Sequence, residues 1–274
     1  MSPLAIIAGS GALPWEAAAA IAPRRPVMVF AIDGEACGGP VEIETHRLGY
    51  GQIGKLFRTM RDRDCSDILF LGAISRRPDY ARILGDFETL KLVPKIVRAA
   101  VGGDDSVVRN VLALFEAEGF RVVSVADAVP ELLAEAGALG RHQPGVGHRR
   151  DMDLGIAFLK ATSSFDVGQA AVVADQRVVA VEGAEGTDAM VERCKALRAS
   201  RRFRAQRGEG VLVKRAKRGQ DMRADVPVVG ARTLERVIEA GFGGIAVEAG
   251  RTIIAERAEL AALADRSGTF VIAV

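Results

Sequence analysis

The chain has 274 residues, with 37 Lys or Arg against 35 Asp or Glu, so its formal net charge is only +2. This length predicts one or two domains, and a hydrophobic content of 49% is typical of globular proteins and excludes an intrinsically disordered chain. The near balance of charge argues against general nucleic-acid binding, and an aromatic content of 5% argues against stacking platforms for single-stranded nucleic acid.

The sequence carries no pattern typical of export or membrane insertion. The three cysteines, Cys37, Cys65 and Cys194, are far apart and odd in number, which predicts neither a disulfide framework nor a zinc cluster. The first residues lack the basic region of a signal peptide, and no stretch approaches the roughly 20 apolar residues of a membrane span. We therefore expect a cytoplasmic protein.

The first half of the chain alternates apolar strands with amphipathic helices. Apolar runs predict buried strands at residues 5–8, 27–32, 68–73 and 121–126. Helical periodicity predicts helices over residues 52–63 and 105–118. This alternation is typical of a parallel sheet with helices on both faces, so residues 1–134 are predicted to form a Rossmann-like α/β domain.

The second half restarts after a segment, residues 135–150, that holds four Gly, one Pro and two His without periodicity and is interpreted as a linker. Residues 151–274 are predicted to form an α/β domain with a mixed sheet. Helices are expected over 152–162, 188–198, 233–240 and from 256, and strands at 170–174, 178–181, 211–214, 244–247, 252–255 and 270–274. Two pairs of these strands are expected to be hairpins, one around residues 175–176 and one around residues 248–251.

The loop after the first strand is a candidate phosphate site. Gly9, Ser10 and Gly11 come between a strand and a helix, where glycine lets the backbone approach a phosphate and helix N–H groups face it. The dinucleotide pattern G-x-G-x-x-G is incomplete because Pro14 takes its third position, although Asp33 ends the second strand, where a ribose-binding acid lies. The pattern indicates a nucleotide or phosphate site. An NAD(P)-dependent oxidoreductase and a plain strand-to-helix turn both stay open.

The loop after the third strand, residues 72–78, has the sequence GAISRRP. Carboxyl ends of parallel strands meet at one edge of the sheet, so this loop is expected beside Gly9 and Gly11, where open α/β sheets bind ligands. Arg76 and Arg77 either contact phosphate or are solvated.

A second group of polar residues, 182–188, lies at a strand-to-helix junction and has the sequence EGAEGTD. Thr187 and Asp188 either cap the following helix or place oxygen atoms beside a metal or a phosphate.

Residues 214–225 form the densest cluster of charge, with the sequence KRAKRGQDMRAD. Lys214 and Lys217 are among the side chains that supply positive charge for phosphates. Asp221 and Asp225 lie four residues apart on an expected loop, and their oxygen atoms suit Mg²⁺ or another divalent cation. Hydrolysis of a phosphoanhydride needs such a mixture, because cations neutralise the diphosphate while a carboxylate positions or deprotonates water. The alternative is a surface loop of paired charges.

Several strings occur in one order along the chain: IIAGSGALP, FAIDGEA, GYGQIGKL, LGAISRRP, DVGQAAVV, VEGAEGTDAM, LVKRAKRGQDMRADVPVVG and GIAVEAGRTII. In this order they resemble the LpxI-type UDP-2,3-diacylglucosamine pyrophosphatases over nearly the whole chain. The resemblance implies hydrolysis of the substrate's diphosphate to UMP and 2,3-diacylglucosamine 1-phosphate (lipid X) in lipid A biosynthesis. It also implies a divalent cation, usually Mg²⁺, and attack of water on the sugar-side phosphorus.

The resemblance implies roles for particular residues as well. The essential acid falls on Asp225. The nucleotide-sugar crevice maps to Gly9, Ser10 and Gly11 together with Ala73, Ile74 and Ser75, and the C-terminal side of a cleft between two domains maps to Gln169, Thr187, Asp188 and Lys214. A nucleotide-sugar binding protein without catalysis is the remaining alternative.

Two associations are expected from the sequence. Residues 193–218 hold eleven Lys or Arg and one acid, Glu209, which indicates either a solvated surface or peripheral contact with the inner membrane leaflet. A homodimer is expected through pairing of the apolar terminal strand, residues 270–274, across subunits.

Overall fold

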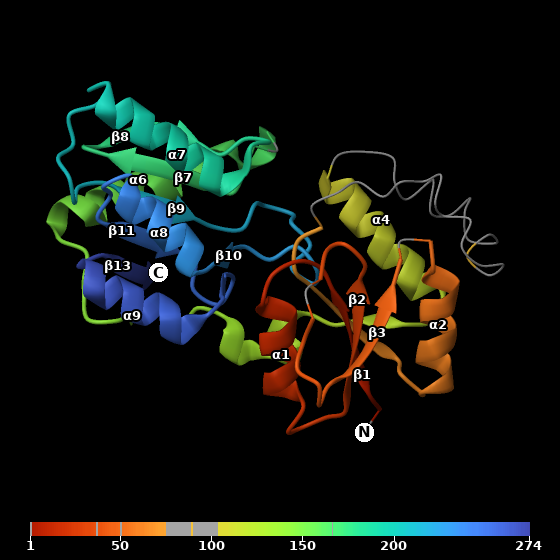
Figure 1. Cartoon of the computed structure of the whole chain (residues 1–274). Coiled ribbons are helices and arrows are strands. Elements are labelled where there is room, and N and C mark those ends of the chain that lie inside the picture. Colours follow the sequence, from red (N-terminus) through yellow and green to blue (C-terminus); the bar gives the residue numbers. More distant parts are fainter. Residues whose placement is uncertain (1, 37, 50, 75–88, 90–103, 166) are drawn as a thin grey trace. The chain divides into compact units, whose positions relative to one another are not determined.

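The computed structural model of the chain describes residues 2–36, 38–49, 51–74, 89, 104–165 and 167–274. The chain forms two compact units (Figure 1). The first unit comprises Met1–Pro130 and Asp221–Asp225, and the second comprises Glu131–Gln220 and Val226–Val274. The segment Asp221–Asp225 therefore belongs to the first unit although its neighbours in sequence belong to the second.

The first unit is built on a sheet of five parallel strands in the order β3-β2-β1-β4-β5. These strands are β1 (Leu4–Ala8), β2 (Val27–Ile32), β3 (Glu44–Leu48), β4 (Asp67–Leu71) and β5 (Arg121–Val122). Every residue of β1 is buried, which is why this strand takes the centre of the sheet. The parallel α/β architecture predicted for the first half is confirmed.

Helices cover both faces of this sheet. They are α1 (Leu13–Ile21), α2 (Ile53–Asp62) and α4 (Asp104–Ala117), and α1 lies on the face opposite to α2 and α4 (Figure 1). Phe57 of α2 meets Phe115 of α4 edge-on, with 5.0 Å between ring centroids, inside the core on that face.

Two details of the first unit differ from the prediction. The strand expected at residues 121–126 ends at Val122, because Ser124 accepts a hydrogen bond from the Asp127 backbone N–H at 3.2 Å and caps a short helix, α5 (Val125–Ala128). The sequence ETHRL of β3 was not predicted as a strand. It is a largely exposed edge strand and lacks the apolar run that marks a buried one.

The second unit contains a mixed sheet of six strands in the order β6-β13-β11-β9-β7-β8, which confirms the predicted mixed sheet. The strands are β6 (Gly137–Leu139), β7 (Ala170–Ala174), β8 (Arg177–Val181), β9 (Val211–Lys214), β11 (Gly244–Val247) and β13 (Phe270–Ala273). The central strands β9, β11 and β13 run parallel, while β6 and β7 pair antiparallel with them and β8 pairs antiparallel with β7.

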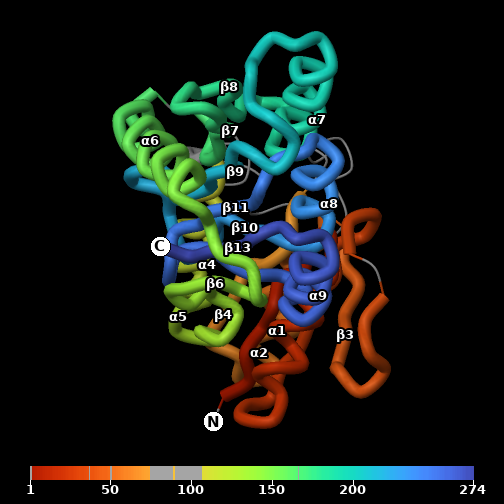
Figure 2. Tube along the Cα trace, turned by 90° about the vertical axis from the view of Figure 1, so that its left-hand side faces the viewer, coloured from red at the N-terminus to blue at the C-terminus, as the bar shows by residue number. Residues whose placement is uncertain are grey.

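Helix α6 (Val146–Thr162) covers one face of this sheet, and the other face carries α7 (Gly186–Ala199), α8 (Ala231–Glu239) and α9 (Arg257–Ser267) (Figure 2). Along β9, Val213 packs in the α6 core and Leu212 packs in the opposite core. Because side chains alternate along a strand, the next residue, Lys214, faces the α7 side. The described part of the chain also contains two 3₁₀ turns, Pro130–Leu132 and Ser163–Phe165. None of the described helices is long and apolar enough to cross a bilayer.

One predicted hairpin is present and the other is wrong. Strands β7 and β8 join through Asp175 and Gln176, whose φ angles are 52° and 57°, the left-handed values that a tight hairpin turn requires. The expected pairing of residues 244–247 with 252–255 does not form, because β9 and β13 occupy both edges of β11. Residues Ile253–Ile254 instead form β12, which pairs with β10 (Val228–Val229) in a separate two-stranded sheet.

The terminal strand is not available for pairing across subunits. β13 has β11 on one edge and β6 on the other, so the expected dimer contact through residues 270–274 is wrong. The strand that closes this edge, β6, lies within residues 135–150, which were interpreted as a linker. α6 also begins within that segment.

A buried carboxylate fastens the first sheet at its amino end. Asp67 in β4 accepts from Arg121 Nε at 2.9 Å and pairs with Arg25 at 2.8 Å. Its side chain is 6% exposed, and the hydrogen bond from Arg121, with the further bond and charge of Arg25, lowers the pKa of the Asp67 carboxyl against the opposing effect of burial.

We expect Asp67→Asn to lower the free energy of unfolding by about 1–3 kcal/mol at pH 7, because hydrogen bonds between charged partners are lost. A lowered folded-state pKa stabilises the protein above the unfolded pKa of about 3.9, and that stabilisation is lost as the pH falls through the folded pKa. Denaturant unfolding should therefore show that the difference in free energy of unfolding between the wild-type protein and Asp67→Asn is smaller at pH 3 than at pH 7. The exposed Asp62 gives the control Asp62→Asn. An equal difference between wild type and Asp67→Asn at both pH values would contradict the stabilisation attributed to the ionised Asp67.

Candidate functional site

The loops that follow β1 and β4 lie against each other at the carboxyl edge of the first sheet. The Gly9 N–H donates to the Leu71 carbonyl at 2.8 Å. The backbone N–H and hydroxyl of Ser10 donate to the Ala73 carbonyl at 2.8 and 2.9 Å. The candidate residues Gly9, Ser10 and Ala73 are thus brought together by backbone contacts.

This close approach explains the glycines. A Cβ at Gly9 would lie 2.5 Å from the Ala73 carbonyl oxygen, and a Cβ at Gly72 would lie 2.7 Å from the Ser10 carbonyl oxygen, so neither position accepts a side chain without movement of the backbone. Gly11 has a φ of +95° and open space around it. The space beside Gly11 lies at the start of α1, where backbone N–H groups attract anions.

The remaining candidates of this edge are partly defined. Ile74 is exposed, at 56% of its maximal surface. Asp33 follows β2, and its backbone N–H donates to the Leu48 carbonyl at 2.9 Å. Ser75, with Arg76 and Arg77, lies outside the described residues.

In the second unit, a buried polar chain connects three candidate residues. Lys214 Nζ donates to Thr187 Oγ1 at 3.1 Å, and Thr187 Oγ1 donates to Glu182 Oε1 at 2.8 Å. Glu182 Oε2 accepts from the Gln169 backbone N–H at 3.0 Å. Lys214, Thr187 and Gln169 therefore meet at one place, and the residue that joins them is Glu182.

Glu182 was not predicted as a site residue. It is one of three acids in the segment 182–188, and of these only Glu182 is buried. The signal that marks it is its place directly after β8, within an apolar strand pair, where an acid needs buried partners.

The same chain extends to the turn that follows β9. Gln220 is 7% exposed, and its side-chain amide donates to Gln169 Oε1 at 3.3 Å and accepts from the Lys217 backbone N–H at 2.8 Å. The backbone of Lys217 is thereby held near Gln169.

Asp188 points to α8 and not to the buried polar chain. Its carboxylate pairs with Arg232 Nε of α8 at 2.9 Å, and its side chain is 36% exposed. Asp188 therefore pairs with α8 and does not join the chain of Glu182, Thr187 and Lys214.

The loop that carries Asp225 packs on the first unit. Ala224 contacts the core beside α4, and Arg223 forms an ion pair with Glu116 of α4. The Asp225 backbone N–H donates to the Asp221 carbonyl at 2.9 Å, which closes the loop into a tight turn.

Within this loop, Asp221 is engaged by Arg223. Arg223 donates from Nε to Asp221 Oδ1 at 2.9 Å and from Nη2 to Asp221 Oδ2 at 2.7 Å. This bidentate hydrogen bonding lowers the pKa of the Asp221 carboxyl and raises the pKa of Arg223.

These contacts decide how a divalent cation fits. Among the described residues, no group of three or more His, Cys, Asp or Glu side chains could hold a metal ion. Both Asp221 oxygens accept hydrogen bonds from Arg223, but Oδ2 accepts one of these and keeps a lone pair, so the predicted role of Asp221 as a metal ligand stays a prediction. Asp225 stays a candidate, because Mg²⁺ commonly binds one or two carboxylates together with substrate phosphates rather than an all-protein cage.

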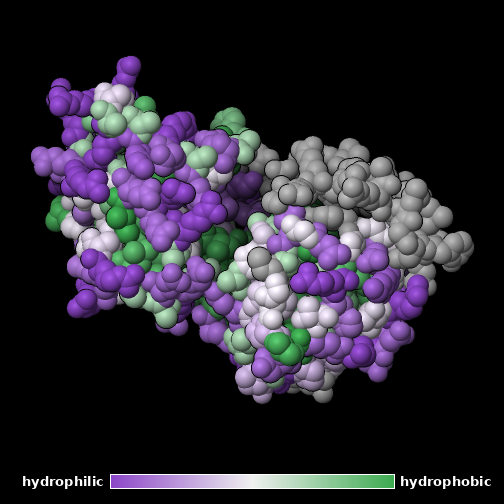
Figure 3. All heavy atoms as spheres, viewed as in Figure 1, coloured by the Kyte–Doolittle hydropathy of each residue, from purple (hydrophilic) through white to green (hydrophobic). Residues whose placement is uncertain are grey.

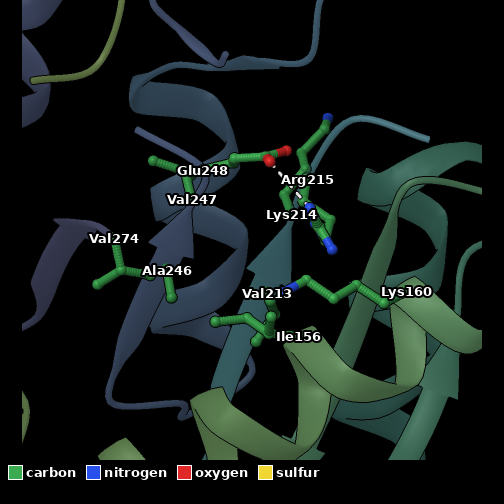
Figure 4. Close-up of a pocket in the computed structure, with 9 residues that line it drawn as sticks. All are labelled: Ile156, Lys160, Val213, Lys214, Arg215, Ala246, Val247, Glu248 and Val274. Atoms are coloured by element: carbon green, nitrogen blue, oxygen red, sulfur yellow. Dashed lines mark hydrogen bonds and ion pairs between the residues drawn. The ribbon is translucent and has the colours of Figure 1, made fainter. Parts of the chain in front are cut away.

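A pocket of about 240 Å³ opens at the ends of β9 and β11, beside α6 (Figure 4). Its lining residues are Ile156, Lys160, Val213, Lys214, Arg215, Ala246, Val247, Glu248 and Val274. Arg215 pairs with Glu248 at 2.8 Å, and the Lys160 side chain reaches across towards Val213 (Figure 4). The pocket therefore has an apolar floor, and its polar rim holds Lys160 and the ion pair of Arg215 with Glu248.

Comparison with protein families accounts for almost the whole chain. Residues 3–132 match the model of the LpxI N-terminal domain, and residues 135–272 match that of the LpxI C-terminal domain. The chain belongs to the LpxI family. It is 38% identical over 275 aligned residues to "UDP-2,3-diacylglucosamine pyrophosphatase LpxI" of Caulobacter vibrioides, with 100% of this chain and 98% of the relative covered.

The LpxI family domains and the compact units differ at two places, of which residues 131–132, in the N-terminal match but in the second unit, are the smaller. Asp221–Asp225 lies inside the segment that matches the LpxI C-terminal domain, but it packs as part of the first unit. The ion pair of Arg223 with Glu116 and the packing of the partly buried Ala224 hold it there.

We expect Gly9→Ala to push the loops after β1 and β4 apart and to cost about 1–3 kcal/mol of stability, the usual range for an overpacked site. The matched control is Gly147→Ala in α6, where a Cβ would meet no atom within 4 Å. Thermal unfolding followed by circular dichroism should show a lower midpoint for Gly9→Ala only. Equal midpoints for Gly9→Ala and the wild-type protein would show that the close contact does not constrain this position.

Proposed function

We propose that this protein hydrolyses the diphosphate of UDP-2,3-diacylglucosamine to UMP and 2,3-diacylglucosamine 1-phosphate, a reaction of lipid A biosynthesis. The observation that carries this proposal is 38% identity, over the full length of the chain, to a relative named for this pyrophosphatase activity. The chemistry of the described residues supports it, because both units present groups that suit a nucleotide diphosphate.

In the first unit, the loops at Gly9–Gly11 and Ala73 are proposed to contact the nucleotide sugar. Gly11 is exposed and lies just before the N-terminus of α1, where backbone N–H groups favour negative charge. In the second unit, Lys214 and Lys217 are proposed to offset phosphate charge. A lysine ammonium acts as a compact point charge towards phosphate oxygens.

Asp225 is proposed as the acid on which turnover depends. In the reaction, a water oxygen forms a bond to the sugar-side phosphorus, the bond from that phosphorus to the bridging oxygen breaks, and UMP leaves with the bridging oxygen. The Asp225 carboxylate would orient the attacking water and accept its proton, or hold a divalent cation by one oxygen. Mg²⁺, when bound, would neutralise charge on the diphosphate.

We further propose that the protein works in the cytoplasm and contacts the inner leaflet peripherally. Hydrophilic side chains gather over α7 and the loop that follows it (Figure 3). Arg201, Arg202, Arg204 and Arg207 are exposed in that loop. Anionic lipids attract such basic segments, and a diacylated substrate resides at a membrane surface.

We expect Asp225→Asn to lower kcat by about 10²- to 10⁴-fold while leaving the fold intact, because it removes a carboxylate that acts on water or on a cation. UMP release from UDP-2,3-diacylglucosamine with Mg²⁺, repeated with EDTA, measures this effect. The exposed Asp153 of α6 gives the matched control Asp153→Asn. An Asp225→Asn protein with a wild-type rate would remove Asp225 from the reaction.

The same assay distinguishes the other two functions. A protein that only binds nucleotide sugars would bind the substrate without releasing UMP, and an NAD(P)-dependent oxidoreductase would bind a nicotinamide cofactor. UMP release that EDTA leaves unchanged would contradict the proposed dependence on a divalent cation.

The site of attack is tested by isotope labelling. Turnover in H₂¹⁸O should place the label in the phosphate of 2,3-diacylglucosamine 1-phosphate, because water is proposed to attack the sugar-side phosphorus. Mass spectrometry of both products reports its position. Label found in UMP would instead place the attack on the phosphorus that bears uridine.

A further inference from the structure

We propose that Glu182 is a positioning residue that fixes the ammonium group of Lys214, through the hydroxyl of Thr187, for contact with the diphosphate. This inference rests on the proposed function, since it assigns Lys214 to the phosphate groups of the substrate. It adds to that function a residue that touches neither the substrate nor the reacting atoms.

The hydrogen bonds of Glu182 determine the direction of the Thr187 hydroxyl. A carboxylate only accepts hydrogen bonds, so the proton of Thr187 Oγ1 points to Glu182 Oε1 across 2.8 Å. The lone pairs of the same oxygen are then left to accept from Lys214 Nζ at 3.1 Å. A hydroxyl that rotated freely could offer its proton to Lys214 and would repel the ammonium group.

Burial makes this arrangement matter energetically. Glu182 and Lys214 are each 7% exposed and Thr187 is 8% exposed, so a negative and a positive group share an interior separated by one hydroxyl. Removing one member of a buried charge pair is costly and permits the other to move. Glu182 therefore offsets the burial of Lys214 and limits the positions open to its ammonium.

Rigid elements hold all three side chains. Glu182 extends the β7–β8 pairing, because its N–H donates to Ala170 and its carbonyl accepts from Gly168, both at 2.9 Å. A Cβ at Gly168 would lie 2.5 Å from Glu182 Cβ, so the two backbones are in close contact. Thr187 comes from the first turn of α7 and Lys214 from the end of β9. Side chains on such elements are placed more precisely than side chains on loops.

A double-mutant cycle on kcat/KM tests this inference with UDP-2,3-diacylglucosamine. We expect Glu182→Gln to lower kcat/KM about 10-fold or more, because a Gln side chain retains only one accepting oxygen for two donors. In a Lys214→Ala background, the same change should lower kcat/KM by less than about 3-fold, because the group it positions is already gone. A residue that only stabilises the fold would reduce kcat/KM by the same factor in both backgrounds, and that result would overturn the proposal.

Thr187 supplies an independent pair of variants. Thr187→Val keeps the shape but removes the hydroxyl, and Thr187→Ser restores the hydroxyl without the methyl group. We expect Thr187→Val to lower kcat/KM about as much as Glu182→Gln does, and to have little effect in the Lys214→Ala background. Thr187→Ser should retain most of the wild-type kcat/KM. If Glu182→Gln does not fold, as judged by its thermal unfolding, the Thr187 cycle decides, and independent effects of Thr187→Val and Lys214→Ala overturn the proposal.

Failure of this inference is distinguishable from failure of the proposed function. Wild-type protein that releases no UMP from the substrate would refute the function itself. Wild-type protein that is active, together with multiplicative effects in both cycles, would leave the function standing and refute only the positioning role of Glu182.

Discussion

A positive charge held inside a sheet protein is the constraint around which the second unit is arranged. Lys214 ends the central strand β9 on the side covered by α7, where water cannot solvate its ammonium group freely. The chain therefore supplies Thr187 from the start of α7 and Glu182 from the end of β8. The ends of β8 and β9 and the start of α7 thereby meet in one polar cluster, and Gly168 lies where a Cβ would come within 2.5 Å of Glu182 Cβ.

In the first unit, backbone contacts rather than buried charges hold the candidate loops in place. Its candidate loops are held by backbone contacts, so the residues there are glycines whose identity follows from close approach and φ rather than from chemistry. The loop Asp221–Asp225 adds carboxylates to this unit, with Arg223 bound to Asp221 on one side and to Glu116 of α4 on the other. This leaves the two carboxylates of the loop unequal, since Asp221 maintains the loop and Asp225 is proposed to act.

The sequence predicts those parts of the fold where local pattern and tertiary role agree. The apolar runs of β1 and β2 signal buried parallel strands because both their faces are covered. β3 and β6 escape prediction because an exposed edge strand and a three-residue strand need no apolar run, and the pairing of β11 depends on which edges its neighbours leave open. In the site, composition finds Lys214 and Thr187 but cannot tell that Asp188 faces Arg232 while Glu182 faces inward, since strand and helix geometry decide these directions.

Contact between Lys214 and the phosphoanhydride is the interaction on which the proposed function most directly depends. A crystal structure of the Asp225→Asn protein with UDP-2,3-diacylglucosamine bound measures it. We expect Lys214 Nζ within hydrogen-bond distance, about 2.7–3.2 Å, of a diphosphate oxygen, with Thr187 still bridging it to Glu182. A diphosphate bound away from both Lys214 and the loop Asp221–Asp225 would contradict the account.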